Sequence, residues 1–284
     1  MSLLTHEAEA MNPDAPTGSL AQNLFRVAGF GAVVTGAGSG LGLAMARVLA
    51  RNGARVTLAD IDERAVQAAA EQLAGEGGSV RVAVLDVADA QAVDELMYGA
   101  AGWGGGLQVV FANAGISAGP GPLREGGNIE AVDGGRWQRV LDVNLSGVLF
   151  SIRAAAKVMN TGYGRIVVTS SVAGIRAEPF VGYAYAAAKH AVVGLVRNAA
   201  VELADRGILV NAIAPGLFRT NIAAAAPDRE KFLADLSRTA LLGRAAETTE
   251  IEGLALFLAS PASSYITGSV LAIDGGASAL RNSL

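Results

Sequence analysis

The sequence predicts an α/β fold, a doubly wound parallel sheet with helices on both faces, because two kinds of segment alternate along the chain. Short runs rich in Val, Ile and Leu are followed by longer runs with helical spacing. The short runs mostly lack the alternation of apolar and polar residues that marks a half-exposed strand, as expected of parallel strands buried on both faces. Strands and helices that alternate in this order build a parallel sheet with a layer of helices on each side.

This alternation predicts a seven-stranded sheet and six helices. The strands are expected at Gly31–Thr35, Arg55–Asp60, Val80–Asp86, Leu107–Ala112, Arg165–Ser170, Ile208–Ala214 and Ser269–Asp274. The helices are expected at Leu41–Arg51, Asp62–Leu73, Ala90–Tyr98, Arg136–Met159, Tyr185–Ala204 and Thr248–Ala259. No break in composition requires a second domain, so we predict a single domain over residues 29–284, preceded by an N-terminal extension, residues 1–28.

Composition argues against several classes of function. The chain has 51% hydrophobic residues, 17% charged residues and a formal net charge of −4, so its charge does not favour nucleic acid or an anionic membrane as a partner. It has no cysteine, which excludes disulfides and thiolate catalysis, and with only 2 histidines no metal site is expected. No apolar run approaches the roughly 20 residues of a membrane span, and the N-terminus lacks the pattern of a signal peptide. We therefore expect a cytoplasmic protein that acts on a small molecule.

A glycine-rich turn follows the first predicted strand. The segment Thr35-Gly36-Ala37-Gly38-Ser39-Gly40-Leu41-Gly42 leads from that strand into the first amphipathic helix. Glycine permits a tight turn and lets the backbone approach a pyrophosphate, while the helix offers free amides and the positive end of its dipole to the phosphates. A glycine cluster alone is weak evidence, but the strand before it and the helix after it indicate a Rossmann-type dinucleotide site.

The second predicted strand ends in a carboxylate, Asp60, about 20 residues beyond the glycines. A carboxylate in this place can accept hydrogen bonds from both hydroxyls of an adenosine ribose, but it would repel a 2′-phosphate. Position 39 is a serine, so no basic residue there offsets this repulsion. We therefore expect the cofactor to be NAD and not NADP, although Asp60 could also be a simple helix cap.

Several motifs, in the same order, resemble those of the short-chain dehydrogenase/reductase family over about residues 30–277. They are Thr35–Gly42, which is similar to its TGxxxGxG turn, Asp86-Val87, Ala112-Asn113-Ala114-Gly115, Val143-Asn144-Leu145, Ser170–Gly174, the Tyr185–Lys189 pair of its YxxxK motif, and Pro215-Gly216 with Thr220. Ala112 stands where the family usually has an asparagine, so one side chain that stabilises the sheet is missing there.

The resemblance implies a set of site residues. The implied cofactor contacts are Gly36, Ser39, Gly40, Leu41, Gly42, Asp60, Ile61, Asp86, Val87, Asn113, Ala114, Gly115, Tyr185, Lys189, Pro215, Gly216, Phe218 and Thr220. The implied catalytic residues are Asn144, Ser171, Tyr185 and Lys189.

The spacing of Tyr185 and Lys189 explains how they could act together. Residues four apart project from one face of a helix. A free tyrosine, with a pKa of about 10, is a poor base at neutral pH, but a fixed cation nearby and the positive charge of an oxidised nicotinamide would favour the phenolate. An anionic Tyr185 could then take the proton of an alcohol while the hydride leaves for the cofactor.

Two further polar residues are expected beside this pair. Ser171 follows a buried strand, where its hydroxyl could hold the reacting oxygen, whereas strand alternation turns Ser170 to the other face. Asn144 lies within a predicted helix although asparagine is a mediocre helix former, and a kink around a water would fit the family's proton relay to Lys189. An ordinary polar helix residue is the alternative for Asn144.

Two other residues near the predicted base are given different roles. Tyr183 has an alanine four residues further on and no cation, so we expect it to line the pocket or to pack. His190 points about 100° around the helix from Lys189 and is expected to pack in the core or in an interface.

Three segments that follow strands are expected to form the substrate pocket, because ligands of open α/β sheets bind beyond the carboxyl ends of the strands. They are residues 116–135, residues 172–182 and a lid over residues 217–243. The lid shows helical spacing at Phe232, Leu233 and Leu236. Apolar side chains in these segments indicate a pocket for a neutral ligand; they are Ile175, Phe180, Leu217 and Phe218.

The expected function is hydride transfer between a secondary alcohol or ketone and NAD(H). Two alternatives are an NADPH-dependent carbonyl reductase and a non-catalytic nicotinamide-binding sensor. The helices Arg136–Met159 and Tyr185–Ala204 are apolar on more than one face, which predicts burial on both sides and hence a homo-oligomer. The family resemblance implies a homotetramer.

Overall fold

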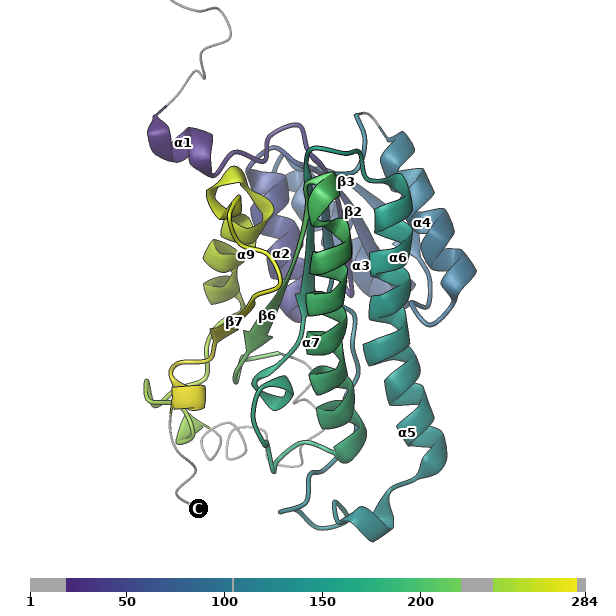
Figure 1. Ribbon diagram of the computed structural model, residues 1–284, viewed down its shortest axis with the longest axis vertical. Coiled ribbons are helices and arrows are strands. Elements are labelled where there is room, and N and C mark those ends of the chain that lie inside the picture. Colours follow the sequence, from purple (N-terminus) through teal and green to yellow (C-terminus); the bar gives the residue numbers. More distant parts are fainter. Residues whose placement is uncertain (1–18, 104, 221–236, 280–284) are drawn as a thin grey trace, which may run out of the picture.

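The computed structural model describes residues 19–103, 105–220 and 237–279. Its centre is a 7-stranded parallel sheet with the strand order β3-β2-β1-β4-β5-β6-β7, which confirms the predicted fold (Figure 1). The strands are β1 (Gly31–Thr35), β2 (Arg55–Asp60), β3 (Ser79–Val84), β4 (Val109–Ala112), β5 (Gly164–Thr169), β6 (Ile208–Pro215) and β7 (Val270–Ile273). The central strands β1, β4 and β5 are buried along their whole length, which explains their uninterrupted apolar sequences.

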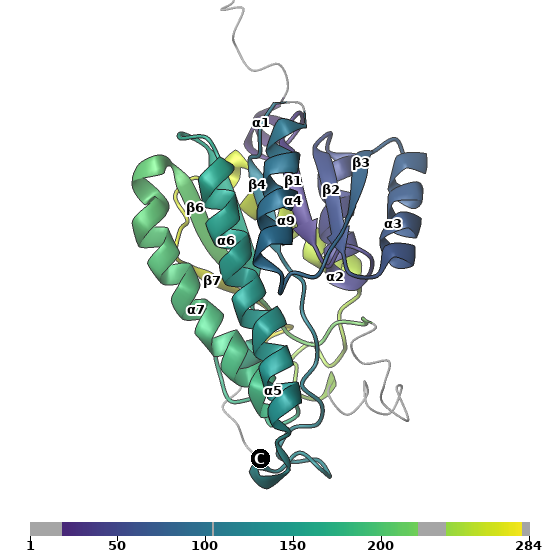
Figure 2. The same ribbon diagram turned by 90° about the vertical axis from the view of Figure 1, so that its right-hand side faces the viewer.

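Helices cover both faces of the sheet (Figures 1 and 2). The longer ones are α2 (Gly40–Arg51), α3 (Glu63–Gly75), α4 (Ala90–Gly102), α5 (Gly134–Leu141), α6 (Gly147–Val158), α7 (Tyr183–Leu203) and α9 (Glu252–Ala259). One apolar core lies between the sheet and α2, α3 and α9, and a second lies between the sheet and α4, α6 and α7. The strand order reverses between β1 and β4, so the crevice expected for a dinucleotide opens at their carboxyl ends.

The helix predicted over Arg136–Met159 is interrupted. A π-helix, Asp142–Ser146, separates α5 from α6. A π-helical turn holds an extra residue, and it is common at functional sites. The prediction of one continuous helix was therefore wrong at the position of Asn144, where hydrophobic periodicity alone gives no sign of the change in hydrogen bonding.

The described residues of the N-terminal extension, 19–28, include a helical segment. A short helix, α1 (Leu20–Leu24), begins at Ser19, whose hydroxyl accepts a hydrogen bond from the Gln22 amide, and the Gln22 side chain accepts one from the Ser19 amide. After it, the Phe25 ring lies 6.5 Å from the ring of Phe257 in α9. This S-x-x-Q capping box is a local sequence signal for the start of a helix.

Part of the predicted lid lies outside the described residues, including Phe232, Leu233 and Leu236. Its described ends are tied together, because the Arg219 amide donates to the Ala246 carbonyl and the Ala246 amide donates to the Leu217 carbonyl. None of the described helices has the length and apolarity needed to cross a membrane.

Candidate active site

The glycine turn between β1 and α2 has no room for a side chain at Gly36 or Gly42. A Cβ on Gly42 would lie 2.0 Å from the carbonyl oxygen of Gly36, and one on Gly36 would lie 2.9 Å from the Cα of Ala114. Gly36 also has φ +67°, which side-chain-bearing residues rarely adopt. The glycines therefore let α2 and the segment after β4 pack directly on this turn, which lies just before the first amides of α2.

Asp60 ends β2 beside this turn. One oxygen of its carboxylate accepts a hydrogen bond from the Gly38 amide at 2.9 Å, and the other accepts one from the Asp62 amide at 3.0 Å. The carboxylate is therefore oriented toward the glycine turn. Ser39 and Ile61 flank it, Ser39 as the N-cap of α2 and Ile61 as a largely exposed side chain. The turn and the carboxylate together fit the adenosine half of a nicotinamide cofactor.

Asn113 joins the ends of three neighbouring strands. Its amide nitrogen donates to the Thr35 carbonyl at 3.0 Å and to the Gly36 carbonyl at 3.3 Å, and its amide oxygen accepts from the Thr169 hydroxyl at 3.0 Å. The Thr35 hydroxyl in turn accepts from the amides of Asn113 and Ala114. Thr35 and Thr169 are contacts that the sequence analysis missed, although each stands at the end of a predicted strand.

Asp86 and Val87 lie after β3 on the same side of the sheet. Asp86 accepts from the Ala88 amide at 2.9 Å and pairs with Arg139 at 2.7 Å. Burial disfavours its charge, but these hydrogen bonds outweigh that effect and hold the pKa of Asp86 below its usual value. Val87 packs on Gly147, where an added Cβ would lie 2.9 Å from its methyl group.

Asn144 is completely buried in the π-helix. Its side chain makes two hydrogen bonds with the backbone of Ile116, accepting from the amide at 2.8 Å and donating to the carbonyl at 2.9 Å. A Cβ on Gly115 would lie 3.3 Å from the amide oxygen of Asn144 and 3.7 Å from the Lys189 ammonium. The structure thus brings Asn144 and Lys189 to the same point of the chain after β4.

Lys189 is buried on the inner face of α7, with 3% of its surface exposed. Its ammonium donates to the Thr169 carbonyl at 2.6 Å and lies 5.5 Å from the centre of the Tyr185 ring. Burial lowers the pKa of Lys189 to about 8. The ammonium is therefore close enough to act on the phenol through its charge.

The Ser171 hydroxyl lies next to Tyr185, close enough to affect the pKa of its phenol. Burial raises the pKa of Tyr185 above its usual value, and the hydrogen bond with Ser171 acts in the opposite direction. The sequence-based expectation was a lowered pKa of Tyr185, caused by Lys189 together with the positive charge of a bound oxidised nicotinamide. The physical reason for the difference is that removal from water destabilises the phenolate by more than the neighbouring groups stabilise it.

The structure shows the contacts of three other residues that the sequence analysis had considered for the site. Ser170 donates its hydroxyl to the Lys189 carbonyl at 3.0 Å, so it lies against the backbone of α7, the helix that also carries Tyr185. His190 is exposed on α7, where Nδ1 lies 2.9 Å from the Ala186 carbonyl oxygen. It therefore does not pack in the core, which was one of the two roles expected of it. Phe218 is 5% exposed and packs in the core beside α2 and α9, so its side chain is not a wall of the pocket.

The segment after β6 runs from the end of β7 to the glycine turn. Gly216 packs so tightly on Asp274 that a Cβ would lie 2.7 Å from the Asp274 Cα. Thr220 lies over the glycine turn, with its methyl group 3.5 Å from the position of a Cβ on Gly40. Leu41 packs at the edge of the core between the turn and α9. These contacts place the predicted cofactor residues on both sides of one crevice.

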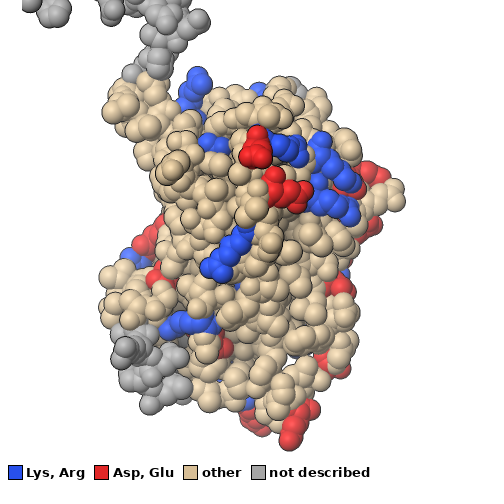
Figure 3. Space-filling model, viewed as in Figure 1, with Lys and Arg blue, Asp and Glu red and all other residues tan. Residues whose placement is uncertain are grey.

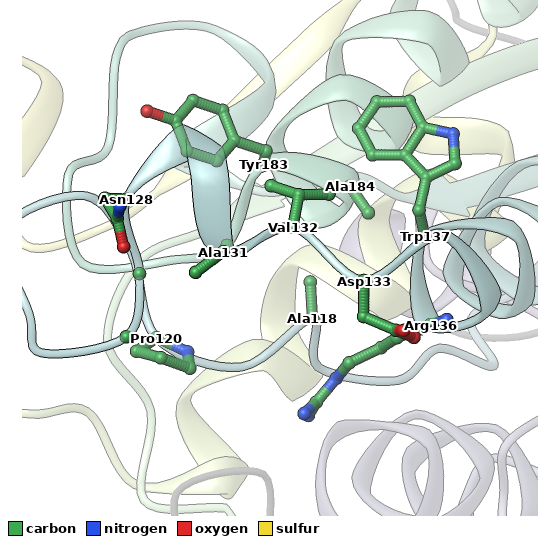
Figure 4. A pocket seen from close by; sticks show the side chains of 13 residues that line it. Ala118, Pro120, Asn128, Ala131, Val132, Asp133, Arg136, Trp137, Tyr183 and Ala184 are labelled. Carbon is green, nitrogen blue, oxygen red and sulfur yellow. Dashed lines mark hydrogen bonds between the residues drawn. The ribbon is translucent and has the colours of Figure 1, made fainter.

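A cavity of about 130 Å³ lies beside this cluster, between the loop after β4 and the starts of α5 and α7 (Figure 4). Tyr183 and Trp137 line it, and Arg136 reaches along its edge. Neither Ser171, Tyr185 nor Lys189 lines this cavity. Tyr183 thus has the pocket-lining role that was expected of it, but in a cavity next to the candidate catalytic residues.

Known proteins share this architecture over nearly the whole chain. Residues 36–278 match the family model described as enoyl-(acyl carrier protein) reductase. The chain is 40% identical, over 88% of its length and 96% of the relative's, to cis-4-hydroxycyclohexanecarboxylate dehydrogenase of Sinomonas cyclohexanicum. It is 37% identical to galactitol 2-dehydrogenase (L-tagatose-forming) of Cereibacter sphaeroides, over 90% of the chain and 97% of the relative. It is 38% identical to a 3-alpha-(or 20-beta)-hydroxysteroid dehydrogenase of Mycobacterium tuberculosis, over 88% and 90%.

Solved structures give the same result. The structure of levodione reductase superposes with a TM-score of 0.84 at 33% identity and covers 90% of this chain and 100% of its own. A second neighbour, from Beutenbergia cavernae, has a TM-score of 0.80 at 39% identity, with the same coverage, and contains NADP at low occupancy. The chain belongs to the short-chain dehydrogenase/reductase family and transfers hydride between a secondary alcohol or ketone and a nicotinamide cofactor.

Proposed function

We propose that Tyr185 is the general acid and base of this hydride transfer, with Ser171, Lys189 and Asn144 as its partners. The observation that carries the proposal is a half-buried Tyr185 that lies next to the buried Ser171, with its ring centre 5.5 Å from the Lys189 ammonium. This cluster lies at the carboxyl ends of β4 and β5, where open α/β sheets bind their ligands.

Each residue has a separate task. The Ser171 hydroxyl holds the reacting oxygen beside Tyr185. The Tyr185 phenolate takes the proton of the alcohol in oxidation, and the phenol returns it to the oxygen in reduction. Lys189 stabilises the phenolate by its charge, and Asn144 fixes the backbone after β4 next to the Lys189 ammonium, on the path by which a proton leaves. A bound oxidised nicotinamide accepts the hydride and adds a positive charge that favours the phenolate.

The Tyr185→Phe variant tests this assignment. Its kcat with NAD and a secondary alcohol should fall by about 1000-fold because the proton acceptor is gone, whereas NADH affinity should stay within about twofold. Tyr183→Phe is the matched control, since Tyr183 lines the neighbouring cavity, and should keep its kcat. Near-normal turnover in purified Tyr185→Phe would remove Tyr185 from the mechanism.

We further propose that the alcohol is carried by a ring. Two of the relatives described above are named for hydroxycyclohexanecarboxylate and hydroxysteroid substrates, and ring alcohols are compact and largely apolar. Apolar side chains stand exposed around the candidate site, Ile175 on the segment after β5 and Leu241 and Leu242 on the segment before α9. Specificity constants for cyclohexanol, a hydroxysteroid and galactitol decide the matter, and a preference for galactitol would contradict the proposal.

NAD is proposed as the preferred cofactor on the basis of Asp60. Its carboxylate is fixed by the amides of Gly38 and Asp62, so it would stand against a 2′-phosphate. The NADP in the neighbour from Beutenbergia cavernae makes a direct test necessary. Wild type should prefer NAD, and Asp60→Ala should reduce the ratio of the two specificity constants at least about tenfold, which corresponds to ~1.4 kcal/mol. A wild type that prefers NADP, or an unchanged ratio in the variant, contradicts this choice.

We also propose a cytoplasmic homotetramer built on α6 and α7. Val201 on α7 is 83% exposed and Leu149 on α6 is 45% exposed. The surface over the lower, N-terminal part of α7 is mostly uncharged, while charged side chains gather over its upper end (Figure 3). Self-complementary faces of this kind are satisfied by closed two-fold symmetry. The lack of cysteine suits a reducing compartment. Sedimentation equilibrium at micromolar protein gives the mass; a 28.7 kDa species at all concentrations would contradict the assembly.

A further inference from the structure

A half-buried ion pair lies in the segment that follows Ser171. The Arg176 guanidinium contacts the Glu178 carboxylate at 3.0 Å, and only 17% and 11% of the two side chains are exposed. The Arg176 amide donates to the Val172 carbonyl, so Arg176 closes the turn that begins directly after Ser171. Neither residue belongs to the candidate catalytic or cofactor sets, and the pair is far less exposed than the other ion pairs near the described lid ends.

Arg176 also reaches a segment 101 residues further along the chain. Its guanidinium donates to the Ala277 carbonyl at 2.7 Å, so one fork of nitrogen atoms binds Glu178 and the C-terminal segment together. Asp274 lies in that segment and accepts hydrogen bonds from the amides of Gly276 and Ser278. Burial disfavours its charge, but the bonds to Ser278 and Gly276 and the positive charge of Arg176 hold the pKa of Asp274 below its usual value.

The C-terminal segment in turn contacts two walls of the site. Gly216, which follows β6 on the cofactor side, packs directly on Asp274. Leu241 and Leu242 pack on Gly276 and Gly275, and the Leu242 amide donates to the Gly275 carbonyl at 3.0 Å. A shift of the C-terminal segment would therefore move the exposed leucines at the end of the predicted lid.

The segment that begins at Glu178 connects Arg176 to the loop after β4. It precedes Pro179, whose carbonyl accepts from the Leu123 amide, and Val181 pairs with Pro120 in an isolated antiparallel bridge. A Cβ on Gly121 would lie 2.3 Å from the Pro179 carbonyl oxygen, so the two loops touch backbone to backbone. The loop after β4 and the segment after β5 consequently move as one wall.

We infer that Arg176 is a positioning residue that sets the shape of the substrate pocket, because it joins the wall after Ser171 to the C-terminal segment. This inference rests on the proposed function for its kinetic part. A buried ion pair is by itself weak evidence for stability, since desolvation offsets much of the attraction. The fork from Arg176 to Glu178 and Ala277 is instead suited to fixing geometry, which the planar guanidinium does better than an ammonium group.

Kinetics of Arg176→Met with a ring alcohol test the inference. The KM should rise about 10- to 100-fold, because small displacements of substrate-positioning groups carry costs of this size, while kcat and NADH affinity stay within about twofold. Arg176→Lys should recover part of the loss, because an ammonium can reach only one of the two partners well. Arg51→Met is the matched control: it removes a more exposed ion pair, with Glu76, at the far end of α2, and should leave KM unchanged.

Hydrogen exchange gives a readout that needs no turnover. In Arg176→Met, exchange should accelerate in residues 174–182, 274–279 and 120–127, and stay unchanged in β4. Acceleration confined to residues 174–182, unchanged KM, or an equal loss of kcat, KM and NADH affinity together would overturn the inference. If the wild type oxidises no alcohol, the proposed function fails, and the exchange pattern alone still decides whether Arg176 joins the three segments.

Discussion

The catalytic frame and the substrate walls of this protein are held together by different means. In the frame, buried polar side chains bond to the backbone of neighbouring strands, as Asn113 does with Thr35 and Asn144 does with Ile116. In the walls, glycines let two loops touch backbone to backbone, as Gly121 does with Pro179. The frame is therefore fixed by buried side chains that bond to neighbouring strands, whereas the walls combine close backbone packing with the single Arg176 fork.

This difference separates chemistry from selection. Lys189 and Tyr185 lie on one helix of the frame, with the ammonium 5.5 Å from the ring centre, and this distance does not involve the substrate walls. Walls made from loops can change their sequence without disturbing that distance, since loops on a rigid scaffold tolerate variation. The comparison predicts that equal substitutions in the two regions have unequal effects.

The largest effect is expected from Gly42→Ala in the frame. Its Cβ would lie 2.0 Å from the Gly36 carbonyl oxygen, which is backbone and cannot move aside cheaply. NADH affinity should fall about 1000-fold, or ~4 kcal/mol, because the turn must open. Fluorescence titration of NADH measures it. Gly253→Ala is the control, since a Cβ there meets nothing within 4 Å, and it should retain full affinity.

The second-largest effect is expected from the buried ammonium of Lys189. Burial lowers the pKa of Lys189 to about 8 from 10.5. Below pH 8 both the folded and unfolded chains carry the proton; between pH 8 and 10.5 only the unfolded chain does, so stability should rise with pH across this window. The free energy of unfolding of the wild type should gain at most ~3 kcal/mol relative to Lys189→Met. Denaturation at pH 7, 9 and 10 measures the difference, and a constant difference would contradict it.

The smallest effect is expected in the wall. Gly121→Ala places a Cβ 2.3 Å from the Pro179 carbonyl oxygen, but here two loops can separate. The KM for a ring alcohol should rise about tenfold, or ~1.4 kcal/mol, with kcat and NADH affinity retained. Steady-state kinetics measure all three quantities. A loss of kcat as large as the change in KM would mean that the walls also hold the catalytic frame.

The sequence was sufficient for the fold, and it predicted which polar residues the structure brings together at the ends of β4 and β5. Uninterrupted apolar runs predicted β1, β4 and β5, and the four-residue spacing predicted that Tyr185 and Lys189 share a face of α7. Both are local patterns, and local patterns survive in the folded chain when every level of structure agrees with them.

Other features depend on contacts that no local pattern carries. The π-helix at Asn144 coincides with two hydrogen bonds that this side chain makes with Ile116, 28 residues away. The burial of Phe218 depends on α2 and α9, and the role of Arg176 depends on Ala277. Side-chain burial also decides the direction in which the pKa of Tyr185 moves. Such pairings are set by tertiary packing, so one sequence without a structure could not supply them.

The two ends of the described chain lie at different distances from the candidate site, so they are not equally suitable for attaching a tag or a linker. The helix α1 packs near α9 at the end of the sheet opposite the candidate site, while residues 277–279 lie at the site's own end (Figure 1). A purification tag or an immobilising linker fused ahead of α1 leaves the molecule away from the substrate entrance. The same linker at the C-terminus pulls on the Ala277 carbonyl and so on Arg176. Surface-coupled preparations should accordingly be anchored through the N-terminus, so that the entrance faces the solution.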